Sequence, residues 1–183
     1  MRVYVGLGSN LRHPRRQLAR AVRALAGLPR TRVVGVSGNY VSDPLDCPGP
    51  QPDFVNAVAA LETALPPLAL LAQLRAIERR QRREPQRQKN ASRTLDLDLL
   101  LYGRARLRHP RLVVPHPRMD ARAFVLRPLT ELSPRVTIPG RGLASSFLPA
   151  VRAQRIEPTR THRTHRPLRL SSPWTSTSSA TLS

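Results

Sequence analysis

The feature that most constrains the fold is a short run of alternating leucine and aspartate in the middle of the chain. Residues 95–99 read LDLDL, so in a β-strand the leucines would point to one face and Asp96 and Asp98 to the other. The two carboxyl groups would then lie roughly 7 Å apart, the rise of two strand residues. Aspartate is a poor strand former, so its place in a strongly apolar run favours a functional position on an open sheet face. The alternative is a half-solvated strand with two surface acids.

Hydrophobic periodicity around this strand indicates an α+β domain. We expect β-strands at residues 2–7, 32–42, 54–63 and 95–102, and amphipathic helices at residues 14–28 and 67–80. The proline-rich stretch at residues 43–53 is expected to be a loop. The order β-α-β-β-α-β is that of a ferredoxin-like sandwich, an antiparallel sheet with helices on one face, to which the later residues are C-terminal additions.

The charge of the chain points to an anionic partner. The sequence holds 31 Lys and Arg residues against 11 Asp and Glu, a formal net charge of +20, and the arginines are densest at residues 79–93. Arginine forks bind phosphate oxygens, and a magnesium ion can bridge carboxylates to phosphate, so a cationic loop beside two aspartates suits phosphoryl or pyrophosphoryl transfer. A basic RNA-binding module with the same topology is an alternative, but it requires exposed aromatic residues on the strand where this chain has two aspartates.

Other features narrow the class of protein further. No apolar stretch reaches the roughly 18 residues of a membrane span, and glycines interrupt the N-terminal sequence where a signal peptide would be apolar, so we expect a cytoplasmic protein. The single cysteine, Cys47, excludes an internal disulfide and a cysteine-based zinc site. The motif GLGSN at residues 6–10 is neither a P-loop nor a dinucleotide fingerprint, and we interpret it as a sharp turn before the first helix.

The last segment of the chain differs in composition from the rest. Residues 157–183 are rich in Arg, Ser and Thr and have no apolar periodicity, so they cannot bury enough apolar surface to offset the entropy of ordering. We therefore expect a folded domain at residues 1–156 followed by a disordered tail at residues 157–183.

Four segments together resemble the 6-hydroxymethyl-7,8-dihydropterin pyrophosphokinase family of folate biosynthesis. They are GLGSNL at residues 6–11, QPDFVNAVAALET at residues 51–63, SRTLDLDLLLYG at residues 92–103 and VPHPRMDARAFVLRPL at residues 114–129. The segments follow the family's order and spacing and cover the chain up to about residue 150. The resemblance implies an α+β fold and transfer of pyrophosphate from ATP to the hydroxymethyl group of the pterin, with release of AMP. It also implies two magnesium ions as cofactor. We expect a monomer whose partners are these two substrates, without nucleic acid.

The resemblance also implies roles for individual residues. Asp96 and Asp98 would bind the magnesium ions, and Asp98 would help to deprotonate the attacking hydroxyl group. Arg83 and Arg93 would be catalytic residues that bind the phosphates of ATP. The other expected ATP-binding residues are Glu78, Leu99, Arg111, His116 and Arg122. The expected pterin-binding residues, which include two aromatic rings that would enclose the pterin and an amide that would bond its rim, are Ser42, Pro44, Leu45, Phe54, Asn56 and Phe124.

The segment before the Asp-Leu-Asp motif departs from the family pattern. Residues 89–92 read Lys-Asn-Ala-Ser where the family usually has Arg-Trp-Gly-Pro, so Asn90 replaces a tryptophan. Arg82 and Asp46 replace glycines, and Pro85 replaces an arginine. The binding residues are retained, whereas the residues that would close over the pterin are changed. A catalytically weakened homologue that still binds ATP is therefore a further alternative.

Overall fold

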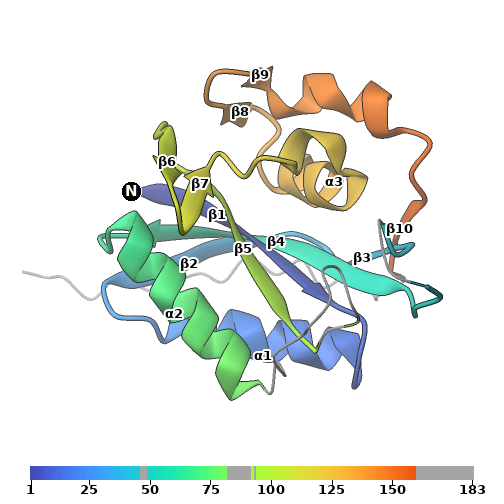
Figure 1. Ribbon diagram of the computed structural model, residues 1–183, viewed down its shortest axis with the longest axis horizontal. Helices are drawn as coiled ribbons and strands as arrows, with labels where there is room; N and C mark the ends of the chain where they lie inside the picture. The colour runs from blue at the N-terminus through green and yellow to red at the C-terminus, as the bar shows by residue number, and fades with distance from the viewer. Residues whose placement is uncertain (46–48, 82–91, 93, 160–183) are drawn as a thin grey trace, which may run out of the picture.

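A six-stranded antiparallel sheet organises the chain, for which the computed structural model describes residues 1–45, 49–81, 92 and 94–159 (Figure 1). The strands run in the order β10-β3-β4-β1-β5, and β2 pairs with the other half of the long strand β4. Between them lie helices α1 (Pro14–Ala26) and α2 (Pro67–Arg80). The strands are β1 (Arg2–Ser9), β2 (Thr31–Val36), β3 (Tyr40–Ser42), β4 (Phe54–Thr63), β5 (Asp96–Tyr102) and β10 (Ile156–Pro158). The expected ferredoxin-like order is confirmed.

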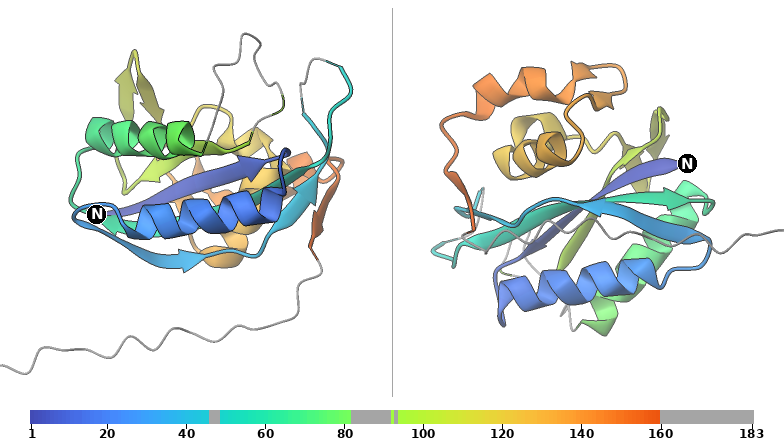
Figure 2. Two further views of the ribbon diagram at one scale, coloured as in Figure 1. Left: turned by 90° about the horizontal axis from the view of Figure 1, so that it is seen from below. Right: turned by 180° about the vertical axis from the view of Figure 1, so that it is seen from behind.

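Helices α1 and α2 cover one face of the sheet together (Figure 2). Apolar residues recur every three or four positions in each helix, so each buries one stripe, as Leu18 and Leu25 do in α1 and Leu70 and Leu74 in α2. They pack on the inward side chains of β1, β4 and β5, among them Leu97. Truncating one of these leucines to alanine would cost about 2–5 kcal/mol of folding free energy.

Most of the C-terminal additions pack on part of the opposite face (Figure 2), whereas Leu112 and Val114 of the β6–β7 hairpin join the first core. Helix α3 contributes Leu126 and Leu129 to a second core, which includes Val58 of β4 and Leu101 of β5. The expected helices thus share one face, while the additions enclose only a portion of the other. These additions are the hairpin β6 (Leu107–His109) and β7 (Leu112–Val114), the 3₁₀ helices η1 (Met119–Ala121) and η2 (Ala144–Val151), helix α3 (Ala123–Leu132), and the hairpin β8 (Thr137–Ile138) and β9 (Gly142–Leu143).

Two local predictions were wrong. The motif at residues 6–10 is not a turn: its first four residues belong to β1, which pairs with strands on both sides, and the left-handed residues Arg12 and His13 make the turn instead. The single strand expected at residues 32–42 is two strands. Residues 37–39 lie opposite residues 57–58, so one residue is extra, and the amide of Gly38 leaves the sheet to donate to the Glu131 carboxylate of α3 at 3.0 Å.

The sheet also extends past the expected domain boundary. Strand β10 includes Glu157 and Pro158 and pairs with β3. The rest of the expected tail, residues 160–183, lies outside the described residues, as do Cys47, Arg83, Asn90 and Arg93. No helix in the described ranges is long and apolar enough to cross a membrane.

Candidate functional site

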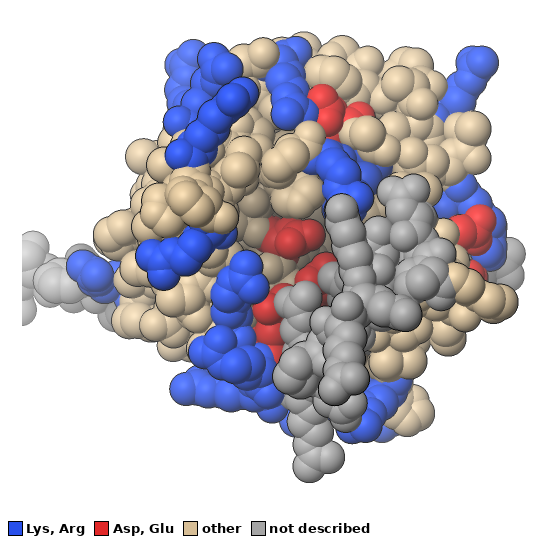
Figure 3. Space-filling model, viewed as in Figure 1, with Lys and Arg blue, Asp and Glu red and all other residues tan. Residues whose placement is uncertain are grey.

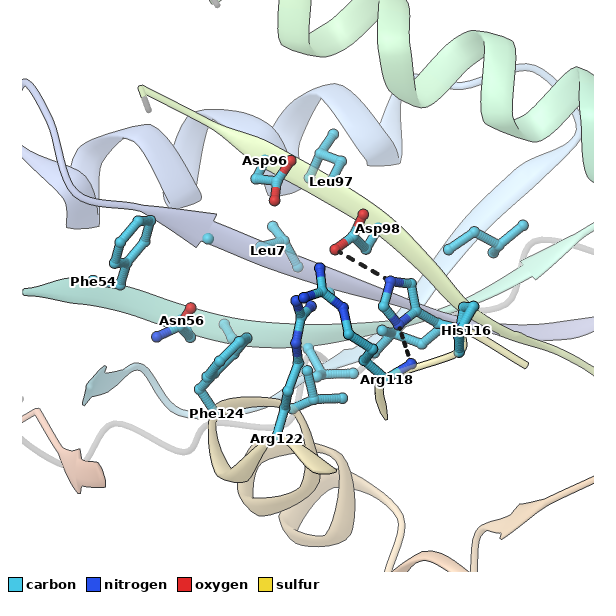
Figure 4. A pocket seen from close by; sticks show the side chains of 18 of the residues that line it. Leu7, Phe54, Asn56, Asp96, Leu97, Asp98, His116, Arg118, Arg122 and Phe124 are labelled. Carbon is cyan, nitrogen blue, oxygen red and sulfur yellow. Dashed lines mark hydrogen bonds and ion pairs between the residues drawn. The ribbon is translucent and has the colours of Figure 1, made fainter. Parts of the chain in front are cut away.

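A pocket lies on the part of the sheet that the C-terminal additions leave open (Figure 4). In the floor of this pocket, Gly8 of β1 pairs with Asn56 of β4 on one side and with Asp96 of β5 on the other, and Gly6 pairs with Asp98. Because glycine has no side chain, β1 leaves space between the carboxylates and the amide. The cavity has a volume of about 430 Å³, within the range of small-molecule sites.

The two aspartates of β5 point into this pocket, while Leu97 between them points into the core (Figure 4). The backbone of the strand is fixed at this point by α2, since the amide of Leu97 donates to the Glu78 carboxylate at 2.8 Å. The Glu78 side chain is buried and also lines the pocket. The expected placement of Asp96 and Asp98 on one open face is therefore confirmed.

The carboxylate pair fits magnesium in one particular binding mode. Within the described residues there is no group of three or more His, Cys, Asp or Glu side chains that could hold a metal ion. Magnesium, however, is usually bound by one or two carboxylates together with water and substrate phosphates rather than by an all-protein cage. Two carboxylates on an open face match that mode.

His116 faces the aspartates from the turn after β7. Its backbone amide donates to the carbonyl of Leu100, and its Nδ1 accepts a hydrogen bond from the backbone amide of Arg118 at 3.3 Å. With Nδ1 as the acceptor, the proton of the neutral ring lies on Nε2, which is 4.0 Å from Asp98 Oδ2. Burial, and then the nearby charges of Arg122 and Arg118, lower the pKa of His116 to about 4. The imidazole is therefore a neutral hydrogen-bond donor at pH 7.

Positive charge surrounds the acidic centre of the pocket. Space-filling atoms of Asp and Glu lie in a hollow bordered by Arg side chains (Figure 3). The arginines that line the cavity come from α2, from the β6–β7 turn and from the segment before α3, and they are Arg75, Arg111, Arg118 and Arg122. Such an arrangement can bind a phosphate-rich anion at its margin and a cation at its centre.

Two aromatic rings form the other end of the pocket. Phe54 begins β4 and Phe124 lies in the first turn of α3, and Asn56 lies between their rings in the view of Figure 4. The Asn56 amide donates to the buried hydroxyl of Ser42 at 2.9 Å, which fixes its orientation. The guanidinium of Arg122 lies 5.3 Å from the centre of the Phe124 ring, so the two ends of the pocket meet there.

The structure brings most of the sequence-predicted residues together. Among the described residues of that set, Pro44 alone does not line the pocket, although its neighbour Leu45 does. Arg83 and Arg93 lie outside the described residues. The residues that do line it are Ser42, Leu45, Phe54, Asn56, Glu78, Asp96, Asp98, Leu99, Arg111, His116, Arg122 and Phe124.

Sequence reasoning missed several residues of the pocket. The most important are Gly6 and Gly8, whose place in the floor follows from the register of β1 against β5. The period-two pattern of β1, in which Val3, Val5 and Leu7 are buried, was the available signal. Arg118 was also missed, although it is two residues from His116 and lines the same cavity.

Comparison with known proteins adds to this geometry. Residues 4–134 match the family described as 7,8-dihydro-6-hydroxymethylpterin-pyrophosphokinase (HPPK). The chain is 55% identical over 143 residues to a 2-amino-4-hydroxy-6-hydroxymethyldihydropteridine pyrophosphokinase from Pseudomonas aeruginosa, with 78% of this chain and 87% of that protein covered. A protein of the same name from Haemophilus influenzae is 46% identical over 145 residues, covering 79% of this chain and 89% of that one.

Solved structures agree at the level of the fold. An HPPK-DHPS crystallised in complex with substrates superposes on 81% of this chain with a TM-score of 0.65 at 11% sequence identity. A wild-type Plasmodium falciparum HPPK-DHPS with SDX-DHP gives a TM-score of 0.60 at 12% identity. The chain spans 43% of the length of each of these proteins.

The fold and these comparisons first define the class of protein: the chain is a ferredoxin-like diphosphotransferase. Within that class, it belongs to the 7,8-dihydro-6-hydroxymethylpterin-pyrophosphokinase family.

Proposed function

We propose that this chain transfers the β,γ-pyrophosphate of ATP to 6-hydroxymethyl-7,8-dihydropterin, a step of folate biosynthesis. The observation that carries the proposal is the pocket in which Asp96 and Asp98 face a histidine and several arginines at one end and two phenylalanine rings at the other. The hydroxymethyl oxygen of the pterin forms a bond to the β-phosphorus of ATP. The bond from that phosphorus to the α,β-bridging oxygen breaks, which releases AMP and leaves the pterin as its diphosphate ester.

The ATP phosphates bind at the cationic end of the pocket. His116 donates from Nε2 to a phosphate oxygen, since its low pKa keeps the ring neutral and its backbone contacts set the ring's orientation. Arg111 and Arg122 bind further phosphate oxygens, and Arg118 adds positive charge beside them. Glu78 and Leu99 line the same end. Arg83 and Arg93, outside the described residues, remain predicted catalytic contacts to the phosphates.

The pterin binds at the aromatic end. Phe54 and Phe124 stack on the two faces of the bicycle, since offset ring stacking stabilises such contacts by about 0.5–1.5 kcal/mol beyond the area they bury. Asn56, oriented by Ser42, bonds the polar rim of the pterin. Pro44 and Leu45 complete the loop beside it. Because Gly8 lies between Asn56 and Asp96 in the sheet, a pterin bound in this way would direct its hydroxymethyl group over Gly8, toward the carboxylates.

Asp96 and Asp98 are the residues that would hold the two magnesium ions. Magnesium bound there would neutralise charge on the phosphate oxygens of ATP. Asp98 also accepts the proton of the attacking hydroxyl group, which returns to solvent once the product has left. We expect the protein to work as a cytoplasmic monomer without nucleic acid.

A coupled binding and turnover experiment tests this function. Calorimetry with a non-hydrolysable ATP analogue and magnesium, followed by the pterin, should show binding of each, and incubation with ATP and pterin should give AMP and the pterin diphosphate in equal amounts by chromatography. Binding without AMP formation would identify the chain as a catalytically weakened homologue. Absence of binding by both ligands would overturn the proposal.

A further inference from the structure

Two consecutive residues just before β10 contact segments on opposite sides of the pocket. Gln154 and Arg155 lie between η2 and β10, outside the cavity itself. We call them the C-terminal clamp. The position of their backbone is fixed on one side by β10, in which Ile156 pairs with Ser42 of β3.

Gln154 holds the segment that carries Arg122 and Phe124. Its Oε1 accepts a hydrogen bond from the backbone amide of Ala123, and its Nε2 donates to the carbonyl of Ala121, both at 2.8 Å. The two bonds bracket Arg122, whose backbone is extended where the first turn of α3 begins. The side-chain amide of Gln154 thus fixes the backbone on both sides of Arg122 and immediately before Phe124.

Arg155 holds the loop on the other side of the pocket. Its Nη1 donates to Asp43 Oδ1 at 2.7 Å and to Asp53 Oδ2 at 3.1 Å, while its Nε donates to Glu157 at 3.1 Å. Asp43 directly follows β3, and Asp53 directly precedes Phe54. The arginine therefore joins the two ends of the loop that contains Leu45.

The charges explain why this contact controls the loop. Asp43, Asp53 and Glu157 are brought to one guanidinium, and without it three carboxylates would face one another. Like charges at such short range repel, so the loop ends would move apart. The side chain of Arg155 is 46% exposed, and exposed ion pairs add little to the free energy of unfolding. The contact thus acts mainly on local position.

We propose that the C-terminal clamp sets the separation of Phe54 and Phe124, and that Gln154 and Arg155 are positioning residues for the pterin. Each contacts a residue that directly precedes one of the two rings. Arg155 binds Asp53, the residue before Phe54, and Gln154 accepts a hydrogen bond from the amide of the residue before Phe124. This inference rests on the proposed function. Gln154 and Arg155 do not line the cavity, so their effect on the pterin passes through the two rings.

The first test compares Arg155→Ala with Arg152→Ala, which changes a neighbouring exposed arginine that does not line the pocket and carries the same change of charge. In calorimetry, Arg155→Ala should weaken pterin binding by about threefold to tenfold, with affinity for the ATP analogue changed by less than about twofold. Arg152→Ala should leave both unchanged. Arg155→Lys should recover only part of the loss, because an ammonium cannot reproduce the fork of a guanidinium.

Further variants at Asp53 and Gln154 separate positioning from a general loss of structure. Arg155→Ala combined with Asp53→Asn should cost less than the sum of the two single changes, since both remove the same contact. Gln154→Ala should weaken binding of both ligands, because it releases Arg122 as well as Phe124, while Gln154→Glu keeps the acceptor and should lose less. The melting temperature of each variant is measured alongside.

The outcomes are distinguishable. If the wild-type chain binds no pterin, the proposed function fails. If wild type binds pterin and Arg155→Ala binds it equally well, or weakens both ligands alike, the assignment of the clamp is overturned. Additive effects of Arg155→Ala and Asp53→Asn would overturn it too.

Discussion

At the scale of single residues, the site depends on carboxylates and a histidine whose surroundings differ sharply. Asp98 is partly open to solvent, with 41% of its side chain exposed, whereas His116 retains 19%. A partly exposed carboxylate can bind a cation, while a buried imidazole among arginines stays neutral. The two groups lie 4.0 Å apart, so the pocket places a carboxylate that can bind a cation next to an imidazole N–H that can donate a hydrogen bond to an anion.

Asp96→Asn and Asp98→Asn should each lower the rate of AMP formation by two orders of magnitude or more, on the order of 3 kcal/mol of transition-state stabilisation. The free energy of unfolding should change by no more than about 0.5 kcal/mol, since neither side chain is part of the core. Glu62→Gln, which removes an exposed acid paired with Arg2 and Arg32 away from the pocket, is the matched control. A variant that keeps the wild-type rate would show that the carboxylate it lacks is dispensable.

The low pKa of His116 predicts a pH dependence of stability in magnesium-free buffer. The folded-state value is about 4 and the ordinary value is 6.5, so between these two pH values the unfolded chain binds the extra proton. The stabilising effect of the neutral ring is complete above pH 6.5 and is lost as the pH falls toward 4, by an amount on the order of 3 kcal/mol. Urea unfolding at pH 7 and pH 4.5 should show a smaller loss for His116→Gln than for wild type. Equal losses would contradict the assignment.

At the scale of elements, β1 shapes the pocket because two of its residues are glycines without side chains. It is central in the sheet, with β4 and β5 on its two sides, and its inward residues are buried. On the other face, Gly6 and Gly8 leave the floor of the pocket bare. The same strand therefore stabilises the core with one face and creates the cavity with the other.

Gly8→Ala should weaken pterin binding on the order of tenfold without lowering the melting temperature. An added Cβ would lie 3.3 Å from Asn56 Oδ1, so the amide would have to move, and small misplacements in a binding site are costly. Gly27→Ala is the control, since Gly27 follows α1 away from the pocket and its Cβ would meet the Ala24 carbonyl oxygen at an ordinary 3.6 Å. Calorimetry on both variants tests this. Equal pterin affinity in Gly8→Ala and wild type would show that Asn56 is not held in place by the bare floor.

At the scale of the whole molecule, the residues of β10 complete a sheet that the N-terminal half begins. Strand β10 is added beside β3, and Thr159 donates a backbone hydrogen bond to Asn39 at 2.8 Å. The folded region thus reaches a few residues beyond the boundary expected from composition.

Two shortened chains should separate these residues from those that follow. A chain that ends after Thr159 should keep pterin affinity and a melting temperature within about 2 °C of the full chain, because residues 160–183 have the composition of a segment that does not pack. A chain that ends after Ala153 loses β10 and the clamp, and should bind the pterin weakly. If the first chain loses affinity as well, residues 160–183 contribute to the site.

The sequence predicted the order of the elements because periodicity is local. Leucines every three or four residues identified α1 and α2, and the bounds of α2 and β4 were correct. The alternation at residues 95–99 likewise placed Asp96 and Asp98 on one face. Both predictions depend only on neighbours along the chain.

The features that were missed depend on contacts between distant segments. The period-two pattern of β1 places its glycines on the face away from the core, but their position beside Asp96 and Asp98 follows only from the register of β1 against β5. Arg155 is one of many cations in the sequence, and only the fold brings it to two aspartates more than a hundred residues away. The split of β2 from β3 depends in the same way on Glu131 of α3.

The contact between Glu78 and Leu97 has a consequence for solubility. Among the described strands, β5 is the outermost on its side of the sheet, and the edge of an outermost strand is a template for pairing with another chain. Glu78 occupies the outward amide of Leu97, and two aspartates alternate with the leucines beside it. An approaching strand would meet an amide that already donates a hydrogen bond, beside three acidic side chains. The acidic residues of the pocket thus also oppose self-association through β5. Charged residues on an edge strand are one of the ways in which proteins avoid aggregation.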